Sequence, residues 1–291
     1  MALKDLMVLL DATEASARRA DLAAALALRH GAYVRGVCLA EAIRPMEPLV
    51  LSADAYAFGS GITAFITEMK ALRERQIAPI EAALDQRLAR DGLTGGFVLE
   101  EGAPIPAALG HARRADLVIA GQTDPEGGKD QPVVNPIEEI LLGAGRPLLV
   151  VPRYGNFPSC GETVLVGWTD TREATRAVHD AMPILAAAKA VTVLTVGGEH
   201  GGGRAGEDGE EVVPAAPVAE HLARHGVPAT AAQTVSGGLS PADVLLNYAS
   251  DIGADLIVVG GYGHSRLREV TLGGVTQSLL QHMTVPVLFS H

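Results

Sequence analysis

The chain has 291 residues, about twice the length of a common domain, so we expect two domains. Hydrophobic residues make up 48% of it and charged residues 20%, which is enough apolar material for two cores. Aromatic residues are only 4%, so these cores must consist of Ala, Val, Leu and Ile. The formal net charge of −11 repels a phosphate backbone, and no basic stripe offsets it, so we expect no nucleic-acid partner.

Cysteine usage and hydropathy restrict the compartment. The two cysteines, Cys38 and Cys160, have no metal-type spacing and are too few for a disulfide framework, which favours a reducing environment. The first residues enter a strand-like run without the charged and apolar regions of a signal peptide. No run approaches the roughly 18 apolar residues of a membrane span. We therefore expect a cytoplasmic protein without a membrane partner.

Strand-like and helix-like segments alternate through the first half of the chain. An Ala- and Arg-rich helical pattern runs from Glu14 to His30, and residues 153–159 form a linker. Buried strands that alternate with helices are typical of right-handed βαβ units in a doubly wound parallel sheet. The strands are predicted near residues 5–11, 32–39, 96–101, 115–121 and 147–152.

The second half shows the same alternation. A helical pattern runs from Thr171 to Lys189, and the stretch from Gly197 to Pro217, rich in Gly and Glu, is expected to be a loop. The strands are predicted near residues 162–168, 190–196, 229–235, 254–260 and 285–290. The predicted fold class is therefore α/β, with two tandem doubly wound parallel sheets of five strands each.

An internal repeat relates the two halves. The segment 115–121 recurs 139 positions later, and the segment 147–151 recurs at the same offset (260 minus 121 and 286 minus 147). Two separate segments in one register indicate a duplication. We place the first domain at residues 1–153 and the second at residues 160–291.

The first half is longer than the second between equivalent strand ends. The distance from Asp11 to Gly121 is 110 positions, whereas that from Thr169 to Gly260 is 91. The first half thus carries about 19 extra residues, which we place around residues 41–61, a stretch that contains Pro and Gly.

A glycine-rich segment follows the fourth strand of the second half. Gly260 and Gly263 are followed, after nine residues, by Gly273 and Gly274 at the start of a predicted helix. Glycines let the backbone approach an anion, and a helix N-terminus directs free N–H groups and a positive dipole toward it. In a doubly wound sheet, ligands bind beyond the carboxyl ends of the strands, where this segment lies. Tight turns and close helix–sheet packing are the alternative explanation for these glycines.

The motif resembles that of the universal stress protein family, Gly-x2-Gly-x9-Gly followed by Ser or Thr, and Gly260, Gly263 and Gly273 match it. The resemblance covers nearly the whole chain, with one family domain in each half. It implies binding of ATP or AMP, with the base near the ends of the first two strands and the phosphates over the glycine loop. Val275 and Thr276 would open the helix beneath the phosphates.

Two positions of the second half depart from the family pattern. Gly274 stands at the Ser/Thr position, so a phosphate-binding hydroxyl is lost, at a cost in affinity of about tenfold or more. Thr169 stands where the family has an Asp, and its neighbour Trp168 either stacks on a base or packs in the core. The loop offers polar side chains that either replace the lost contacts or lie in solvent, namely His264, Ser265 and Arg266.

The first half shows the opposite pattern. Asp11 stands where the family has its nucleotide-proximal Asp, although capping of the next helix would explain it equally well. In the glycine loop Gly121 remains, but Asp124 and Val134 occupy the other two glycine positions and Asn135 the Ser/Thr position. A carboxylate that faces phosphates repels them. We therefore expect no triphosphate in the first half.

The sequence lacks the motifs of the common hydrolases and kinases. The sequence contains no Gly-x-Ser-x-Gly elbow and no Walker lysine, so hydrolase and P-loop kinase functions are not supported. His221 and His225 are spaced to share a helix face, but without a third ligand nearby we expect no zinc site. We predict no catalytic residue and no metal ligand.

The prediction is a stress-responsive, non-enzymatic protein that binds an adenine nucleotide, ATP or AMP with or without Mg²⁺, in its second half. A scaffold protein that has lost nucleotide binding is the first alternative, and a weak ATPase is the second. The predicted nucleotide-binding residues are Gly260, Gly263, His264, Gly273, Gly274, Val275, Thr276 and Thr169.

The resemblance also predicts how the halves associate. In the family the fifth strand mediates dimers by edge pairing, and here residues 148–152 and 285–290 are expected to pair within one chain. The two halves would then form an intrachain pseudo-dimer, which hides two sheet edges. A homodimer beyond this pseudo-dimer is left open.

Overall fold

The computed structural model describes residues 2–41, 55–123, 136–197, 214–261 and 274–291. Within these residues the first half contains five strands and four helices. They are β1 (Asp5–Leu10), α1 (Glu14–His30), β2 (Tyr33–Glu41), α2 (Ala55–Asp91), β3 (Gly95–Gly102), α3 (Pro104–Ala112), β4 (Leu117–Gly121), α4 (Ile137–Gly143) and β5 (Leu148–Val151).

The described part of the second half repeats this order. Its elements are β6 (Thr163–Gly167), α5 (Arg172–Leu185), β7 (Ala190–Gly197), α6 (Ala216–Arg224), β8 (Ala229–Val235), α7 (Pro241–Asp251), β9 (Leu256–Gly260), α8 (Gly274–His282) and β10 (Val287–Ser290).

The predicted strands are confirmed, and their ends lie within two residues of the predicted ones. The helix predicted from Glu14 to His30 has those bounds. The helix predicted from Thr171 to Lys189 is shorter, because Thr171 is its N-cap and the backbone N–H of Lys189 already bonds to the carbonyl of Glu162 at the start of the sheet.

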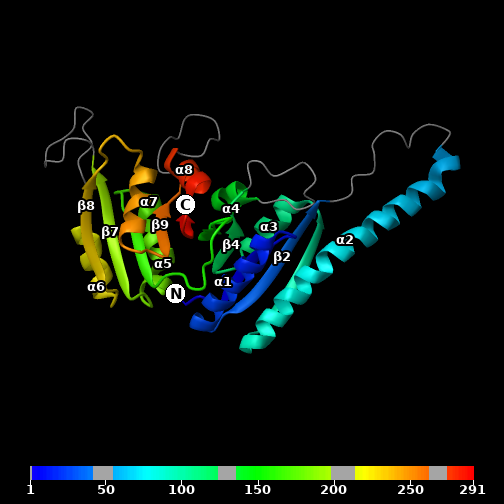
Figure 1. Cartoon of the computed structure of the whole chain (residues 1–291), viewed down its shortest axis with the longest axis horizontal. Helices are drawn as coiled ribbons and strands as arrows, with labels where there is room; N and C mark the ends of the chain where they lie inside the picture. The colour runs from blue at the N-terminus through cyan, green and yellow to red at the C-terminus, as the bar shows by residue number, and fades with distance from the viewer. Residues whose placement is uncertain (1, 42–54, 124–135, 198–213, 262–273) are drawn as a thin grey trace.

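All ten described strands belong to one sheet, in the order β3-β2-β1-β4-β5-β10-β9-β6-β7-β8. Neighbours within each half are parallel, whereas β5 and β10 are antiparallel, with Leu149 opposite Leu288. The two predicted five-stranded sheets are thus joined edge to edge, and the predicted intrachain pairing is confirmed. Figure 1 shows the sheet running through both halves, with the junction at its centre.

Helices cover both faces of the sheet (Figure 1). On one face the buried core includes Leu22 of α1, Leu84 of α2, Ile184 of α5 and Leu222 of α6. On the other face it includes Ala108 of α3, Ile140 of α4, Leu245 of α7 and Leu279 of α8. Both cores consist mainly of aliphatic side chains, with Trp168 as the buried aromatic residue of the first cluster and Phe289 as that of the second.

The extra length of the first half is largely helical. Residues 55–61, which the sequence suggested as part of an irregular insertion, form the first two turns of α2. α2 has 37 residues, whereas its counterpart α6 has nine, and its N-terminal part extends beyond the sheet (Figure 1). Residues 42–54 lie outside the described part, as do residues 198–213 of the predicted loop; α6 begins at Ala216, so the loop ends earlier than predicted.

Among the described residues, no helix is both long and apolar enough to cross a membrane.

Candidate functional site

The predicted nucleotide site of the second half lies at the carboxyl ends of β6 and β9. Gly167 of β6 pairs with Val259 of β9, so Thr169 and Gly260 follow two adjacent strand ends. α8 begins at Gly274 near the same edge. Three of the predicted residues, Gly263, His264 and Gly273, lie outside the described residues, as do Ser265 and Arg266.

Gly260 is required by packing. A Cβ atom at this position would lie 2.6 Å from the backbone nitrogen of Ala174 and 2.6 Å from the carbonyl carbon of Glu173, in the first turn of α5. Neither backbone atom can move without displacing the helix. The close helix–sheet packing that the sequence left open as an alternative is therefore present at Gly260, whatever else this glycine does.

The start of α8 is open on the side of Gly274. A Cβ atom added to Gly274 would meet nothing within 4 Å among the described residues, and Val275 is 38% exposed. Thr276 is buried, so its side chain points to the interior of the fold. The N–H groups in the first turn of a helix have no partner within that helix, and the helix dipole makes them suitable for an anion.

Thr169 is exposed in the turn before α5. Its hydroxyl lies 3.2 Å from that of Thr171, which in turn accepts a hydrogen bond from the N–H of Ala174 and caps α5. Thr169 therefore has a short hydroxyl where the family has a carboxylate, at the surface of the predicted site.

Two buried polar atoms belong to residues on adjacent strands, Trp168 directly after β6 and Thr195 in β7. The side chains of Trp168 and Thr195 are 8% and 6% exposed, and their Nε1 and Oγ1 atoms have no hydrogen-bond partner among the described residues. The N–H of Trp168 bonds to the carbonyl of Leu194, which places the two residues on adjacent strands. Such buried groups normally have a partner in the protein, a water or a ligand. Thr195 was missed in the sequence, where it is one Thr in a run of strand residues.

The equivalent strand end of the first half is filled by an ion pair. Leu6 and Val164 hold equivalent positions, since they pair with Leu117 and Leu256, and this register makes Asp11 the counterpart of Thr169. The carboxylate of Asp11 binds the guanidinium of Arg19, which is 4% exposed.

Two backbone hydrogen bonds hold this ion pair in place. Arg19 donates through Nε to the carbonyl of Leu9 at 3.0 Å, and Asp11 accepts from the backbone N–H of Thr13 at 2.8 Å. Burial lowers the pKa of Arg19, and Asp11 acts in the opposite direction. The N-cap of α1 is Thr13 and not Asp11, so the capping explanation for Asp11 was wrong.

The arginine also occupies the space beside the glycine that the first half retains. A Cβ atom at Gly121 would collide with the guanidinium of Arg19. Arg19 could not be recognised as a site residue from the sequence, because nothing in the helical pattern shows that α1 directs this side chain toward the end of β4. The predicted loss of a triphosphate site in the first half rests on Asp124, Val134 and Asn135, which lie outside the described residues.

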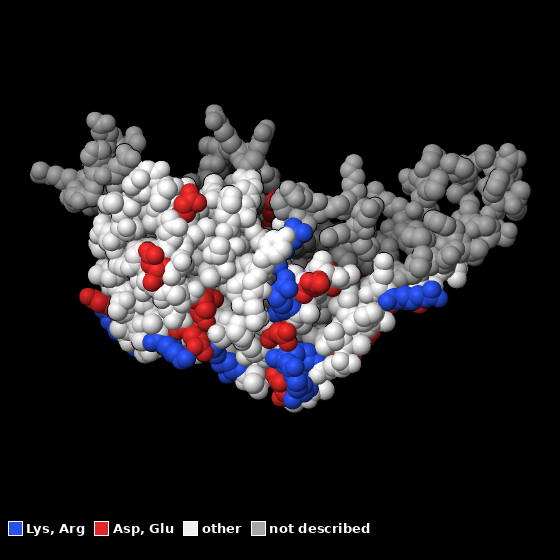
Figure 2. Space-filling model, in the orientation of Figure 1, with Lys and Arg blue, Asp and Glu red and all other residues white. Residues whose placement is uncertain are grey.

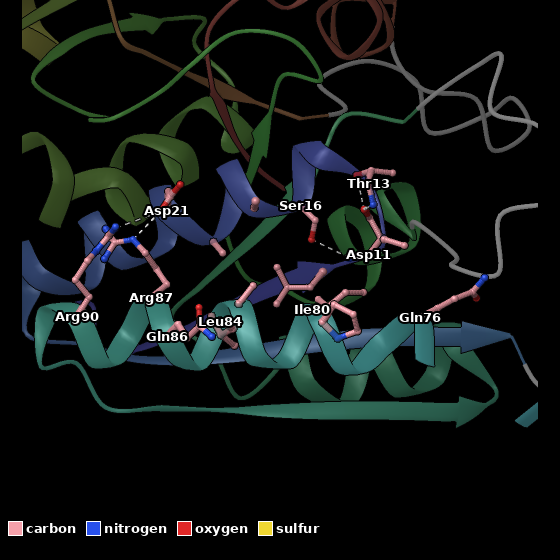
Figure 3. Close-up of a pocket in the computed structure, with 16 residues that line it drawn as sticks. Asp11, Thr13, Ser16, Asp21, Gln76, Ile80, Leu84, Gln86, Arg87 and Arg90 are labelled. Atoms are coloured by element: carbon pink, nitrogen blue, oxygen red, sulfur yellow. Dashed lines mark hydrogen bonds and ion pairs between the residues drawn. The ribbon is translucent and has the colours of Figure 1, made fainter. Parts of the chain in front are cut away.

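A cavity of about 650 Å³ lies between α1 and α2, on the face of the first half that these two helices cover (Figure 3). Asp11, Thr13 and Ser16 lie at one end of it. Asp21, Arg87 and Arg90 lie at the other end, and the middle is apolar. Nothing in the residue pattern predicts this cavity beyond the small residues of α1.

Three histidines form a ring cluster on the outside of the second half. The ring centroids of His179 and His221 are 5.8 Å apart and stacked, and those of His221 and His225 are 4.8 Å apart. In the described part of the chain, no three His, Cys, Asp or Glu side chains are grouped so that they would hold a metal ion.

The charged side chains are intermingled on the face shown in Figure 2. Blue and red residues lie next to one another along the lower edge, and most of the remaining described surface in this view is uncharged. This face offers no extended patch of one sign in the part of the chain that is coloured.

Comparison with known proteins gives a family for the second half. Residues 162–291 match the sequence profile of the universal stress protein family. The chain is 44% identical over 57 residues to the universal stress protein YxiE of Bacillus subtilis, and 35% identical over 48 residues to the universal stress protein MJ0577 of Methanocaldococcus jannaschii. These segments are 20% and 16% of this chain and span only 38% and 30% of the two relatives.

The fold of the whole chain also has a solved counterpart. The crystal structure of a universal stress protein from Archaeoglobus fulgidus superimposes with a TM-score of 0.69 at 15% identity, over 98% of this chain and 95% of that one. The tandem arrangement of both halves is therefore shared with a known fold.

Proposed function

We propose that the chain binds ATP or AMP non-catalytically at the glycine loop of its second half, on the premise that residues 162–291 match the universal stress protein family. The observation that carries the proposal is the position of the two described ends of that loop. Gly260 ends β9 and Gly274 begins α8, so the two described ends of the loop lie at the carboxyl edge of the sheet, where doubly wound folds bind ligands. The residues proposed for binding are those predicted from the sequence, namely Thr169, Gly260, Gly263, His264, Gly273, Gly274, Val275 and Thr276.

The buried polar atoms of Trp168 and Thr195 support a polar ligand at this edge. A base placed against β6 and β7 would give the indole N–H and the hydroxyl the partners that they lack among the described residues. The open first turn of α8 would serve the phosphates through its N–H groups, with Mg²⁺ as a counter-ion of the nucleotide. The loss of a hydroxyl at Gly274 weakens this site without removing its backbone donors.

The carboxylate next to Gly260 is unsuited to catalysis. Burial raises the pKa of Glu173, but hydrogen bonds from its own backbone N–H and from Arg172 outweigh this effect and keep the pKa below its ordinary value. Glu173 is also ion-paired with Arg172 at 2.9 Å. A base with a lowered pKa takes up a proton poorly at neutral pH. We therefore propose binding without turnover.

The alternative is a scaffold protein that has lost nucleotide binding. The packing role of Gly260 favours it, because that glycine is explained without a ligand. In either case we propose domain limits at residues 1–153 and 160–291 and a cytoplasmic location. Measurement of the molecular mass in solution would show whether two chains form a further homodimer.

Calorimetry tests the proposal directly. ATP and AMP are titrated, with and without Mg²⁺, into the wild type, into Gly263→Asp and into the control Gly110→Asp. The control adds the same charge to α3, at a position where a Cβ meets nothing within 4 Å. We expect micromolar binding by the wild type and the control, and loss of binding in Gly263→Asp. No binding at millimolar nucleotide, or equal binding by Gly263→Asp, would leave the scaffold function.

Two further readouts locate the ligand and test turnover. Trp168 is the only tryptophan of the chain, so its fluorescence should change when a base binds next to it. A nucleotide that binds without changing this fluorescence would contradict the position of the base. Release of inorganic phosphate during incubation with ATP would contradict the non-catalytic proposal.

A further inference from the structure

The cavity between α1 and α2 is separate from the glycine loop, because it lies in the other half of the chain (Figure 3). We propose that it is a second binding site, which takes a small amphipathic carboxylate with its apolar body between the helices and its carboxylate at Arg90. This site does not depend on the proposed nucleotide function.

The cavity exists because the first half has small side chains where the second half has large ones. Leu10 and Ala20 line it, and in the shared register their counterparts are Trp168 and Val178, both buried. A volume of about 650 Å³ lies within the range of small-molecule sites, roughly 300–1,000 Å³. The two helices of the first half therefore leave room for a ligand, whereas larger side chains fill the equivalent space in the second half.

The middle of the cavity suits an apolar body. Leu10 and Leu84 are 2% and 1% exposed and form its floor, and Ile80 of α2 is half-buried beside them. Ala17 and Ala83 are exposed at its rim and leave the space accessible. Apolar area that a ligand removes from water here stabilises its complex.

The charges at one end leave an arginine available. Asp21 accepts from Arg87 Nε at 2.6 Å, and Asp91 binds the same guanidinium. Arg90 approaches Asp21 at 3.8 Å and Asp91 at 3.7 Å, which is beyond hydrogen-bond distance, and it is 66% exposed. In the described part of the chain both aspartates are hydrogen-bonded to Arg87, and Arg90 donates to neither. A guanidinium with unused donors binds a carboxylate in a bidentate manner.

The opposite end fixes the orientation of the ligand. There the carboxylate of Asp11 binds Arg19 and Thr13 and offers no cation to an anionic group. Ten residues of α2 separate Ile80 from Arg90, a rise of about 15 Å at 1.5 Å per residue. A medium-chain fatty acid such as decanoate has this length and this distribution of charge.

Calorimetric titration of decanoate into the full chain tests the site. The variant Ala83→Phe fills the cavity from the rim, and Ala82→Phe is its control, since Ala82 is exposed on the same helix but does not line the cavity. The variant Arg90→Gln removes the head-group contact, and Arg75→Gln is its control on an exposed, non-lining position. Circular dichroism verifies that each variant is folded.

We expect submillimolar binding by the wild type and both controls, loss of binding in Ala83→Phe, and a decrease of about tenfold in Arg90→Gln. Decanol should bind at least about tenfold more weakly than decanoate, since it lacks the charged group. The proposal is overturned if wild type does not bind decanoate at millimolar concentration, if Ala83→Phe binds as wild type does, or if decanol binds equally well.

Discussion

The two halves of the sheet place different chemistry at equivalent positions. At the end of β1, Asp11 and the buried Arg19 form an ion pair, whereas at the end of β6 the counterpart Thr169 is an exposed hydroxyl. The first half therefore satisfies this strand end with its own charges. The second half has a neutral, exposed hydroxyl at this position, and the buried polar atoms of Trp168 and Thr195 have no partners among the described residues. The comparison teaches that one fold can either close a ligand edge internally or keep it open.

A second set of positions shows the same divergence. Gly92 and Gly226, both with positive φ, end α2 and α6, and this match aligns Arg87 with His221 and Asp91 with His225. On the neighbouring helices Asp21 aligns with His179. An Asp–Arg–Asp ion cluster in the first half thus corresponds to three imidazoles in ring contact in the second, one pair stacked and the other edge to face.

Breaking the buried ion pair should have the largest effect. Asp11→Ala leaves the Arg19 guanidinium buried without its counter-ion, so we expect the free energy of unfolding to fall by about 3–5 kcal/mol in guanidinium titrations. The matched change Thr169→Ala, at the exposed counterpart, should stay within about 0.5 kcal/mol. Similar losses in both variants would show that the two strand ends are not as different as the structure indicates.

The two ends of the glycine loop should respond differently to a methyl group. Gly260→Ala forces a Cβ against the backbone of α5, and we expect thermal unfolding to reveal a loss of about 1–3 kcal/mol. Gly274→Ala meets none of the described residues at a helix start and should be neutral or stabilising by up to about 1 kcal/mol. Equal destabilisation of the two variants would refute the distinction.

One glutamine adds hydrogen bonds to the contact between the halves. Gln122 donates to the carbonyls of Leu280 at 2.8 Å and Gln281 at 3.0 Å in α8, and its Oε1 accepts from the N–H of Arg153. In Gln122→Ala we expect a loss of about 1–2 kcal/mol in denaturant titrations. Its counterpart Gly261 instead packs against Leu141, and a variant as stable as wild type would mean that these hydrogen bonds do not join the halves.

The smallest expected effect is on the pH dependence of stability, through the ion cluster of Asp21, Arg87 and Asp91. The hydrogen bond from Arg87 lowers the pKa of Asp91. The ionised Asp91 therefore contributes to stability above the ordinary Asp pKa, and this contribution is lost as the pH falls through the lowered value. Arg87→Ala should raise the pKa of Asp91, as measured by NMR titration of the carboxyl carbon. His221→Ala is the control at the counterpart position and should leave this titration unchanged.

The helices and strands could be predicted from the sequence, but the side-chain contacts between them could not. The strand 229–235 and the helix from Glu14 to His30 were predicted with their observed bounds, because periodicity is a local property. The ion pair of Asp11 with Arg19 was not, because it depends on how α1 is rotated over β1. The cavity was missed for a similar reason: it is defined by the distance between α1 and α2, which no spacing in the chain encodes.

The antiparallel contact of β5 with β10 has a consequence for thermodynamics. Two separate subunits that share such an edge come apart on dilution, because their association is bimolecular. Here both strands belong to one polypeptide, so the effective concentration of one for the other is fixed by the tether and does not fall when the solution is diluted. Dilution should therefore leave the pairing of β5 with β10, and with it the ten-stranded sheet, intact.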